Sequence, residues 1–409
     1  MSTPQQKVSA LNGDEAIALA AKQSNVDVVA AYPITPQTII VERFSEYVAD
    51  GEVDTQFVCT ESEHSALSAC VTASATGART FTASASAGLA LMHEILYVAS
   101  GCRTPVVMAI ANRALSAPIN IHCDHSDSMV ERDSSWIQLY VENSQEAYDS
   151  TIQAFRIAEN LDLLLPVMVC LDAFVLSHTL ENVKVLPDAA VSKFVGEREF
   201  IQVKSHEGTK VPLRLDPKNP ITIGPLALYD YYFEHKRQQE DAMQKASKII
   251  RDIHDEFCEL SGRKYGNGLV DAYQLKDAQM AVVCVGSTAG TVKTVVDQLR
   301  LRGIKAGLLR LRAFRPLPTT DIQKALANVE IVGVMDRSIS FGGQGGPVFH
   351  EIRHSLYESK PQPFIQNYIY GLGGRDMPPH SIEWIYKDLE KTLKRKMVET
   401  LVNFVGVRS

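Results

Sequence analysis

The chain has 409 residues, of which 45% are hydrophobic and 22% are charged, and its formal net charge is −7. This composition is typical of a globular protein with a large core, and the length predicts two or three domains. The negative charge opposes a nucleic-acid partner, because phosphate binding needs a basic face. No apolar run approaches the roughly 20 residues that cross a bilayer, and the first residues lack the apolar segment of a signal peptide. We therefore expect no membrane association and a cytoplasmic location.

Seven cysteines are scattered along the chain, and no two of them form a C-x-x-C pair. Local spacing therefore provides neither an iron–sulfur cluster site nor a zinc ribbon. Dispersed cysteines in odd number are typical of buried, reduced thiols in a cytosolic protein. We expect no metal and no cluster in this chain, which makes it a poor candidate for carrying electrons itself.

The first part of the chain alternates predicted strands with predicted helices. Apolar runs predict strands at residues 27–32, 55–60, 79–83, 105–111 and 166–172. The segments between them predict helices at residues 37–48, 63–76, 88–100 and 145–161. This alternation predicts an α/β fold with a parallel sheet covered on both faces. Ligands of such sheets bind beyond the carboxyl ends of the strands, so residues 33–36, 60–63 and 111–113 should lie close together.

The alternation stops after about residue 191. Residues 192–226 are polar and rich in proline and glycine, and residues 229–260 predict a long, charged helix that packs on a neighbouring element. A second α/β unit then follows, with predicted strands at residues 280–285, 306–311 and 330–335 and a helix at residues 291–302. The predicted domain limits are 1–190, 191–275 (a connector with the long helix) and 276–409.

Glu63 is the first candidate for chemistry, because it follows a predicted strand at the start of the next helix. Small residues such as Ala66, Ala69 and Ala73 follow it and leave room for the close approach of a backbone or a flat ring. A carboxylate at this position also has an ordinary interpretation, since it faces the positive end of the helix dipole. Glu61 competes with Glu63 for either role.

Two further candidates lie where predicted strands end. The segment Tyr-Pro-Ile-Thr-Pro at residues 32–36 has two prolines that stiffen the backbone around Thr35, as a binding loop requires, although an ordinary turn has the same pattern. Arg113 follows the strand predicted at residues 105–111, and its planar guanidinium suits a substrate carboxylate.

Three other patterns suggest ligands less specifically. The loop after Arg113 contains four metal-type side chains, but spacing in a loop is weak evidence for a metal: His122, Asp124, His125 and Asp127. The glycine-rich segments 286–290 and 341–346 resemble phosphate-binding turns. The first lacks the complete G-x-G-x-x-G pattern and a later acidic residue, and the second lacks the lysine of a P-loop. We predict structural turns at both.

Taken together, these segments resemble the alpha subunit of the 2-oxoacid:ferredoxin oxidoreductases, the four-subunit pyruvate type in particular. The matching stretches cover nearly the whole chain in the family's order and include NGDEA (12–16), AAYPITPQT (30–38), ESEHSA (61–66), ANRALSAPINIHCDHSD (111–127), RAFRPLP (312–318), DRSISFGGQGGP (336–347) and GLGGRD (371–376). The resemblance implies a pyrimidine-type thiamine-diphosphate-binding domain at residues 1–190 and a transketolase-C-terminal-like α/β domain at residues 276–409.

The resemblance also implies roles for individual residues. Glu63 would face N1′ of the cofactor's aminopyrimidine as the catalytic carboxylate, and Thr35 and Arg113 would face the carboxylate and carbonyl of the substrate. The pyrimidine side of the pocket would be lined by Pro33, Ile34 and Ile121. One departure is visible, because the family often has Ser-Gln-Gly where residues 86–88 are Ser-Ala-Gly. That change puts a side-chain hydrogen bond at position 87 in doubt.

The implied activity is the oxidative decarboxylation of pyruvate with coenzyme A to acetyl-CoA and CO₂, with the electrons passed to ferredoxin. Beta, gamma and delta subunits would complete the complex, and Mg²⁺ and [4Fe-4S] clusters would lie on these partner subunits. The same chemistry on 2-oxoisovalerate or another 2-oxoacid is the alternative. A third hypothesis is a catalytically silent scaffold, which the joint presence of Glu63, Thr35 and Arg113 opposes.

Overall fold

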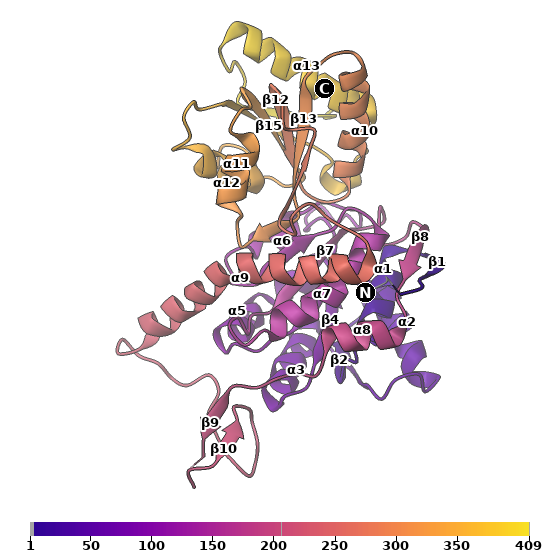
Figure 1. Cartoon of the computed structure of the whole chain (residues 1–409), viewed down its shortest axis with the longest axis vertical. Helices are drawn as coiled ribbons and strands as arrows, with labels where there is room; N and C mark the ends of the chain where they lie inside the picture. Colours follow the sequence, from indigo (N-terminus) through magenta and orange to yellow (C-terminus); the bar gives the residue numbers. More distant parts are fainter. Residues whose placement is uncertain (1–3, 206, 409) are drawn as a thin grey trace.

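The computed structural model describes residues 4–205 and 207–408, and two helix-covered sheets dominate it (Figure 1). The first sheet, in the lower body of Figure 1, has seven strands in the order β14-β6-β7-β5-β4-β2-β3. These strands are β2 (Val28–Ala31), β3 (Gln56–Cys59), β4 (Thr80–Ser84), β5 (Val107–Asn112), β6 (Ile137–Tyr140), β7 (Val167–Asp172) and β14 (Ala313–Arg315). Neighbouring strands are parallel, except that β14 pairs antiparallel with β6. The predicted parallel α/β fold is confirmed.

The central strands of this sheet are buried along their whole length, which explains why β5 and β7 are apolar up to their last residue. The helices of this body are α1 (Gly13–Gln23), α2 (Thr38–Ala49), α3 (Glu63–Thr76), α4 (Ser86–Leu91), α5 (His93–Gly101), α6 (Ser126–Val130), α7 (Ser144–Glu159) and α8 (Asp188–Val195). Local capping fixes where α1 begins, because the Asn12 side chain accepts from the Glu15 amide and the Glu15 carboxylate accepts from the Asn12 amide.

The single helix predicted at residues 88–100 is instead two short helices, α4 and α5, separated at Met92. The Met92 amide donates to the carbonyls of both Gly88 and Leu89, so the backbone tightens at this residue. Both helices contact α3, but α4 also contacts α6 whereas α5 also contacts α9. As a consequence, Gly88 lies in the short helix α4, which begins directly after the end of β4.

The second sheet, in the upper body of Figure 1, has the order β11-β13-β12-β15-β16-β17. Its strands are β11 (Val270–Tyr273), β12 (Met280–Cys284), β13 (Ala306–Leu311), β15 (Ile331–Asp336), β16 (Phe364–Ile369) and β17 (Val402–Phe404). The helices around it are α10 (Thr288–Leu301), α11 (Thr319–Leu326), α12 (Pro347–Leu356) and α13 (Pro379–Arg395). Between β13 and β15 the chain returns to the first sheet as β14, a crossing that the sequence analysis did not predict.

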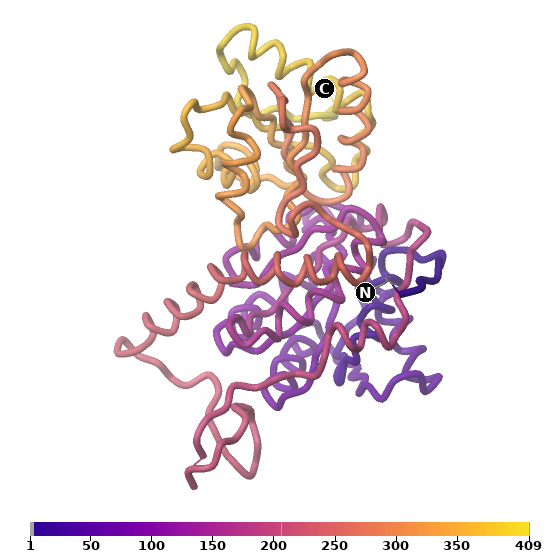
Figure 2. The backbone as a smooth tube through the Cα atoms, viewed as in Figure 1, coloured from indigo at the N-terminus to yellow at the C-terminus, as the bar shows by residue number. Residues whose placement is uncertain are grey.

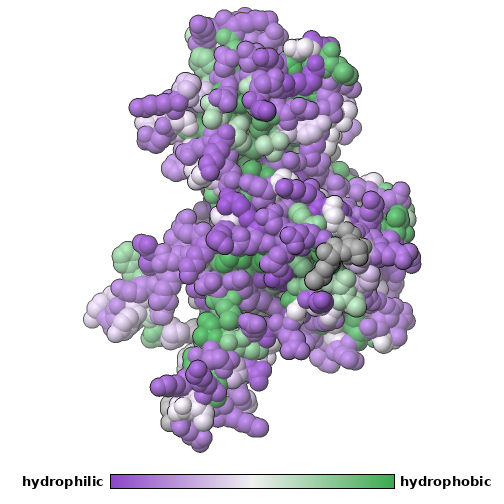
Figure 3. Space-filling view, viewed as in Figure 1, coloured by the Kyte–Doolittle hydropathy of each residue, from purple (hydrophilic) through white to green (hydrophobic). Residues whose placement is uncertain are grey.

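The segment between the two sheets projects from the body (Figure 2). A strand pair, β1 (Lys7–Leu11) with β8 (Glu181–Val185), precedes it, and a small hairpin, β9 (Gln202–Lys204) with β10 (Lys210–Pro212), lies at its lower end. The chain returns through α9 (Tyr232–Ser261), the predicted long helix, which packs on α7 and α5. Figure 3 shows apolar surface beside the base of the hairpin. Among the described helices, none is both long and apolar enough to span a membrane.

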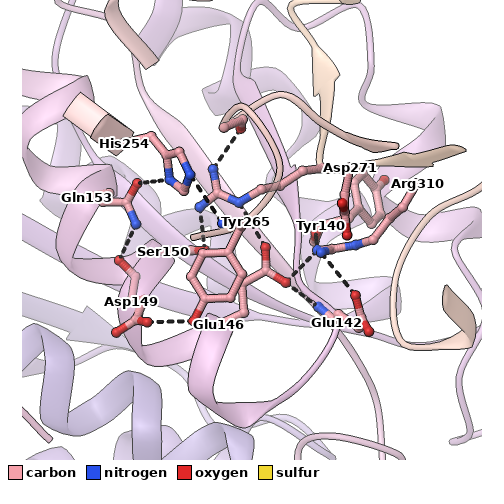
Figure 4. A network of polar contacts seen from close by, with 12 residues as sticks. Tyr140, Glu142, Glu146, Asp149, Ser150, Gln153, His254, Tyr265, Asp271 and Arg310 are labelled. Carbon is pink, nitrogen blue, oxygen red and sulfur yellow. Dashed lines mark hydrogen bonds and ion pairs between the residues drawn. The ribbon is translucent and has the colours of Figure 1, made fainter. Parts of the chain in front are cut away.

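A buried polar network connects the two sheets (Figure 4). Arg310 of β13 donates to the carbonyl of Tyr140 and to the carboxylate of Glu146 in the first turn of α7. Arg312 donates to the other oxygen of Glu146 and to the hydroxyl of Ser150. Both arginines and Glu146 are buried. The two sheets are therefore joined by paired charges as well as by apolar contacts.

Candidate active site

The predicted site segments meet at one edge of the first sheet. Residues 32–36 follow β2, Glu63 begins the helix after β3, and Arg113 follows β5. Because β5, β4, β2 and β3 are neighbours in this order and run parallel, their carboxyl ends lie on the same edge. The expectation that these three segments lie close together is confirmed.

Glu63 is the first residue of α3, and only 7% of its surface is exposed. The helix is capped by Ser62, whose hydroxyl accepts from the Ser65 amide, so the Glu63 carboxylate is not used as the cap. A Cβ atom on Gly88 would lie 2.5 Å from Glu63 Oε1 and 2.6 Å from Ser84 Oγ. Only glycine at position 88 thus leaves room for this carboxylate. Within residues 4–205 and 207–408, no hydrogen-bond donor is paired with the Glu63 carboxylate, which leaves its oxygens available to a ligand.

Glu61, the competing carboxylate, has a different environment. It is exposed, and it accepts from the hydroxyl of Ser65 one turn further along the chain. This hydrogen bond is the main cause that lowers the pKa of Glu61. Glu61 therefore lies at the solvent-facing start of the helix, whereas Glu63 is buried, so the two glutamates have different surroundings.

Arg113 is buried, with 7% of its surface exposed, and backbone carbonyls hold its guanidinium from two sides. Its Nη1 donates to the carbonyl of Thr35 over 2.9 Å, and its Nε donates to the carbonyl of Asn120 over 3.1 Å. The structure thus brings Arg113 and the 32–36 segment into direct contact. Thr35 itself is exposed.

The three residues predicted to line a cofactor ring lie in the same two segments. Pro33 is exposed, Ile34 is half-buried against the core, and Ile121 is 40% exposed. Ile121 belongs to the loop that follows Arg113. The site is therefore an open edge of this chain, in contrast to a cleft of about 1560 Å³ that lies elsewhere, among α7, α8 and α9.

Asp127 is a structural residue of the site whose role the sequence analysis missed. Its buried carboxylate accepts from the amides of Ser86 and Arg113, each over 2.9 Å, and from the side chain of Asn112. Burial raises its pKa to about 6 against the opposing effect of these hydrogen bonds. Asp127 therefore connects Ser86, at the start of the helix that contains Gly88, with Arg113, at the start of the following loop. Its place in a loop of metal-type residues was the only sequence signal.

Asp124 and His125, two other metal-type side chains of this loop, have structural partners. Asp124 accepts from the Ser126 amide, and His125 pairs with Asp172 over 2.8 Å. Cys123, His125 and Asp172 form a buried group of possible ligand atoms within 4.8 Å of one another. Arg337 also contacts Asp172, over 3.0 Å. Although burial alone raises the pKa of Asp172, the charges of His125 and Arg337 bring it well below its usual range, so the carboxylate already has its counter-charges.

Both glycine-rich turns of the second sheet are occupied by carboxylates of this chain. Gly286 has a φ of +71°, and a Cβ there would lie 2.8 Å from Asp172 Oδ1, while Ser287 donates to the same carboxylate. At the start of α12, Asp336 accepts from the amides of Val348 and Phe349. These amides are the groups that a bound phosphate would use, so the structure supports the prediction of structural turns.

Comparison with known proteins identifies the family. The model of the thiamine-diphosphate-binding part of pyruvate flavodoxin/ferredoxin oxidoreductase matches residues 19–255, and that of pyruvate:ferredoxin oxidoreductase core domain II matches residues 278–382. The pyruvate synthase subunit PorA of Methanocaldococcus jannaschii is 52% identical, over 94% of this chain and 95% of the relative. The ketoisovalerate oxidoreductase subunit VorA of Pyrococcus abyssi is 42% identical, over 97% of this chain and 98% of the relative.

A solved structure also has the same fold. It is a 2-oxoglutarate:ferredoxin oxidoreductase of Magnetococcus marinus, with a TM-score of 0.74 and 19% identity, covering 93% of this chain and 65% of that one. The match of the family model to more than half of the chain, together with relatives of similar length, settles the assignment. The chain belongs to the pyruvate flavodoxin/ferredoxin oxidoreductase family and contains that family's thiamine-diphosphate-binding domain.

Proposed function

We propose that this chain is the alpha subunit of a pyruvate:ferredoxin oxidoreductase (pyruvate synthase) and provides the pyrimidine side of its thiamine diphosphate pocket. The observation that carries the proposal is the Glu63 carboxylate at the same sheet edge as Arg113, where it is buried against Gly88 and has no hydrogen-bond donor among the described residues. Pyruvate is favoured over 2-oxoisovalerate, because the PorA relative is 52% identical and the VorA relative 42%.

The residues present fit the cofactor, since glycine at position 88 leaves room for the buried Glu63 carboxylate, which has no hydrogen-bond donor within the described residues. In this proposal, Pro33, Ile34 and Ile121 line the pyrimidine ring, and Glu63 accepts a hydrogen bond from N1′ and holds the proton there. Thiamine diphosphate supplies the nucleophilic carbon and the electron sink for decarboxylation. A carboxylate at N1′ favours the protonation state of the ring that this chemistry needs.

Arg113 and Thr35 are proposed to bind the 2-oxoacid. The guanidinium would hold the substrate carboxylate through charge-assisted hydrogen bonds, and the Thr35 hydroxyl would donate to the substrate. Two backbone carbonyls already fix the plane of the guanidinium, so little of its freedom is lost when the substrate binds. The Arg113 guanidinium at this edge suits a monocarboxylate such as pyruvate.

Beta, gamma and delta subunits are proposed to complete the enzyme, with Mg²⁺ and [4Fe-4S] clusters on these partners and coenzyme A and ferredoxin as further reactants. The open edge at Thr35 and Ile121 fits a site that a second chain closes. Residues 226–233 support the same conclusion, because Leu226, Tyr229 and Phe233 are each at least 79% exposed. Exposed apolar side chains in such a group are typical of protein–protein contacts.

Turnover by the assembled complex tests this function. With coenzyme A and a low-potential acceptor, we expect the highest kcat/KM for pyruvate among pyruvate, 2-oxobutyrate, 2-oxoisovalerate and 2-oxoglutarate. A preference for 2-oxoisovalerate would support the alternative substrate. Absence of turnover with every 2-oxoacid, in a complex that holds its cofactor, would support the silent scaffold.

A further inference from the structure

A turn that follows β16 in the second sheet contacts the loop that follows Arg113. Asn120 Nδ2 donates to the carbonyl of Gly373 over 3.0 Å, and the Gly374 amide donates to the carbonyl of Cys123 over 2.6 Å. The approach is close, because a Cβ on Gly374 would lie 2.3 Å from the Cβ of His122. This turn, residues 371–374, therefore fixes the position of residues 120–123.

Asn120 connects this turn to Arg113. Its backbone carbonyl accepts from Arg113 Nε over 3.1 Å, while its side-chain Oδ1 accepts from the His122 amide over 2.7 Å. Its remaining group, the side-chain NH₂, is the one that reaches Gly373. Each polar group of the Asn120 side chain thus has one defined partner, and the backbone carbonyl of the same residue accepts from Arg113.

We propose that Asn120 is a positioning residue through which the second sheet's turn sets the orientation of the Arg113 guanidinium for its substrate. The inference rests on the substrate-binding role proposed for Arg113. Two carbonyls, of Thr35 and Asn120, define the plane of the guanidinium. When the Gly373 contact is lost, the Asn120 carbonyl shifts and the plane turns away from the substrate carboxylate. A small displacement of a binding group is costly because hydrogen bonding is directional.

Asn120→Asp is the sharpest variant, because it keeps the oxygen for the His122 amide and removes the donor to Gly373. In the assembled complex we expect the KM for pyruvate to rise roughly fivefold to tenfold, as for the loss of one hydrogen bond. We expect kcat to stay within about twofold, because the contact acts equally in ground and transition states. Exchange of the cofactor's C2 proton without pyruvate should not change, since it does not involve Arg113. An unchanged KM overturns the inference.

Arg113→Lys, measured in parallel, separates this inference from the proposed function. If Arg113→Lys raises the KM for pyruvate and Asn120→Asp does not, only the positioning role is wrong. If neither variant changes the KM, the proposed role of Arg113 fails and the inference fails with it. The matched control is Asn328→Asp, at an exposed asparagine remote from this edge, which should leave the KM unchanged.

Gly373→Ala tests the same contact from the other side. A Cβ at this position would lie 2.4 Å from Asn120 Nδ2, so the amide must move. We expect Gly373→Ala alone to raise the KM for pyruvate. In an Asn120→Ala background, which has no side-chain amide to displace, Gly373→Ala should raise the KM by a smaller factor. Independent, multiplicative effects of the two changes would contradict the proposed connection.

Discussion

Arg312 donates from Nε to Glu146 Oε1 over 2.8 Å, although both side chains are fully buried between the two sheets. Burial alone raises the pKa of Glu146, but the charges of Arg310 and Arg312 reverse this effect and hold the pKa below its ordinary value. A carboxyl with a lowered pKa stabilises the folded state at neutral pH. That stabilisation is lost as the pH falls through the folded-state pKa.

Glu146→Gln should therefore destabilise the chain strongly, because it leaves the buried Arg312 guanidinium without its counter-charge and leaves Arg310 paired with Glu142 alone. Breaking a buried pair on one side typically costs about 3–5 kcal/mol. The free energy of unfolding, measured by denaturant titration at pH 7, checks this value. Glu390→Gln removes one partner of the exposed pair with Lys394 and should cost about 0.5 kcal/mol or less. Equal effects of the two changes would contradict the importance of the buried network.

Asp336 makes the opposite contribution to the pH dependence of stability. Burial raises its pKa to about 7, while the amides of Val348 and Phe349 and the side chain of Asn367 oppose the rise. A raised pKa means that its stabilising contribution is complete below about pH 4 and is lost as the pH rises towards 7. Asp336→Asn should flatten the dependence of the unfolding free energy in this window. Parallel curves for the two proteins between pH 4 and 8 would exclude this contribution.

Glu63→Gln should lower kcat by about 10² to 10⁴, because the amide keeps the shape of the side chain but cannot hold a proton at N1′ in the same way. Exchange of the cofactor's C2 proton should slow in parallel, while cofactor affinity changes little. Glu61→Gln is the matched control, since Glu61 is exposed and contacts Ser65. If Glu61→Gln abolished exchange and Glu63→Gln left it intact, the assignment of the activating carboxylate would be wrong.

Gly88→Ala should also lower activity, because its Cβ would meet Glu63 Oε1 at 2.5 Å and displace the carboxylate. We expect a kcat reduced by at least about tenfold, with the loss again visible in C2 proton exchange. Gly101→Ala is the control, since the nearest atom to its Cβ is Lys236 Nζ at 3.9 Å. Full activity of the Gly88→Ala complex would show that Glu63 has more room than this contact indicates.

The isolated chain should bind no stoichiometric iron or sulfide after aerobic or anaerobic purification. In the part of the chain that the structure describes, the metal-type group of Cys123, His125 and Asp172 contains a single cysteine, and Asp172 is already paired with Arg337. A [4Fe-4S] cluster needs about four thiolate ligands. Iron and acid-labile sulfide assays on the purified chain decide the question, and four irons per chain would overturn the proposed division between subunits.

The sheet and its edge were predictable because local chemistry determines them. Strands buried on both faces, such as β5 and β7, are apolar up to their last residue, and parallel strands bring residues 33–36, 63 and 113 to one edge. The break at Met92 was not predictable, because it depends on which elements α4 and α5 contact. Nor was the role of Asp127, whose partners are backbone amides that carry no sequence signal. The domain limits at residues 190 and 275 stay a prediction.

The pairing of β14 with β6 has a consequence for how the chain is made. During synthesis, residues 137–140 leave the ribosome long before residues 313–315, so β6 can pair with β7 while its outer edge still lacks β14. An unpaired edge is a template for association with other strands. The nascent chain must therefore keep the outer edge of β6 from such contacts until much of the second sheet has been translated. If the gene were divided after residue 275, β14 would lie on a second polypeptide, and β6 would gain its partner only when the two polypeptides associate.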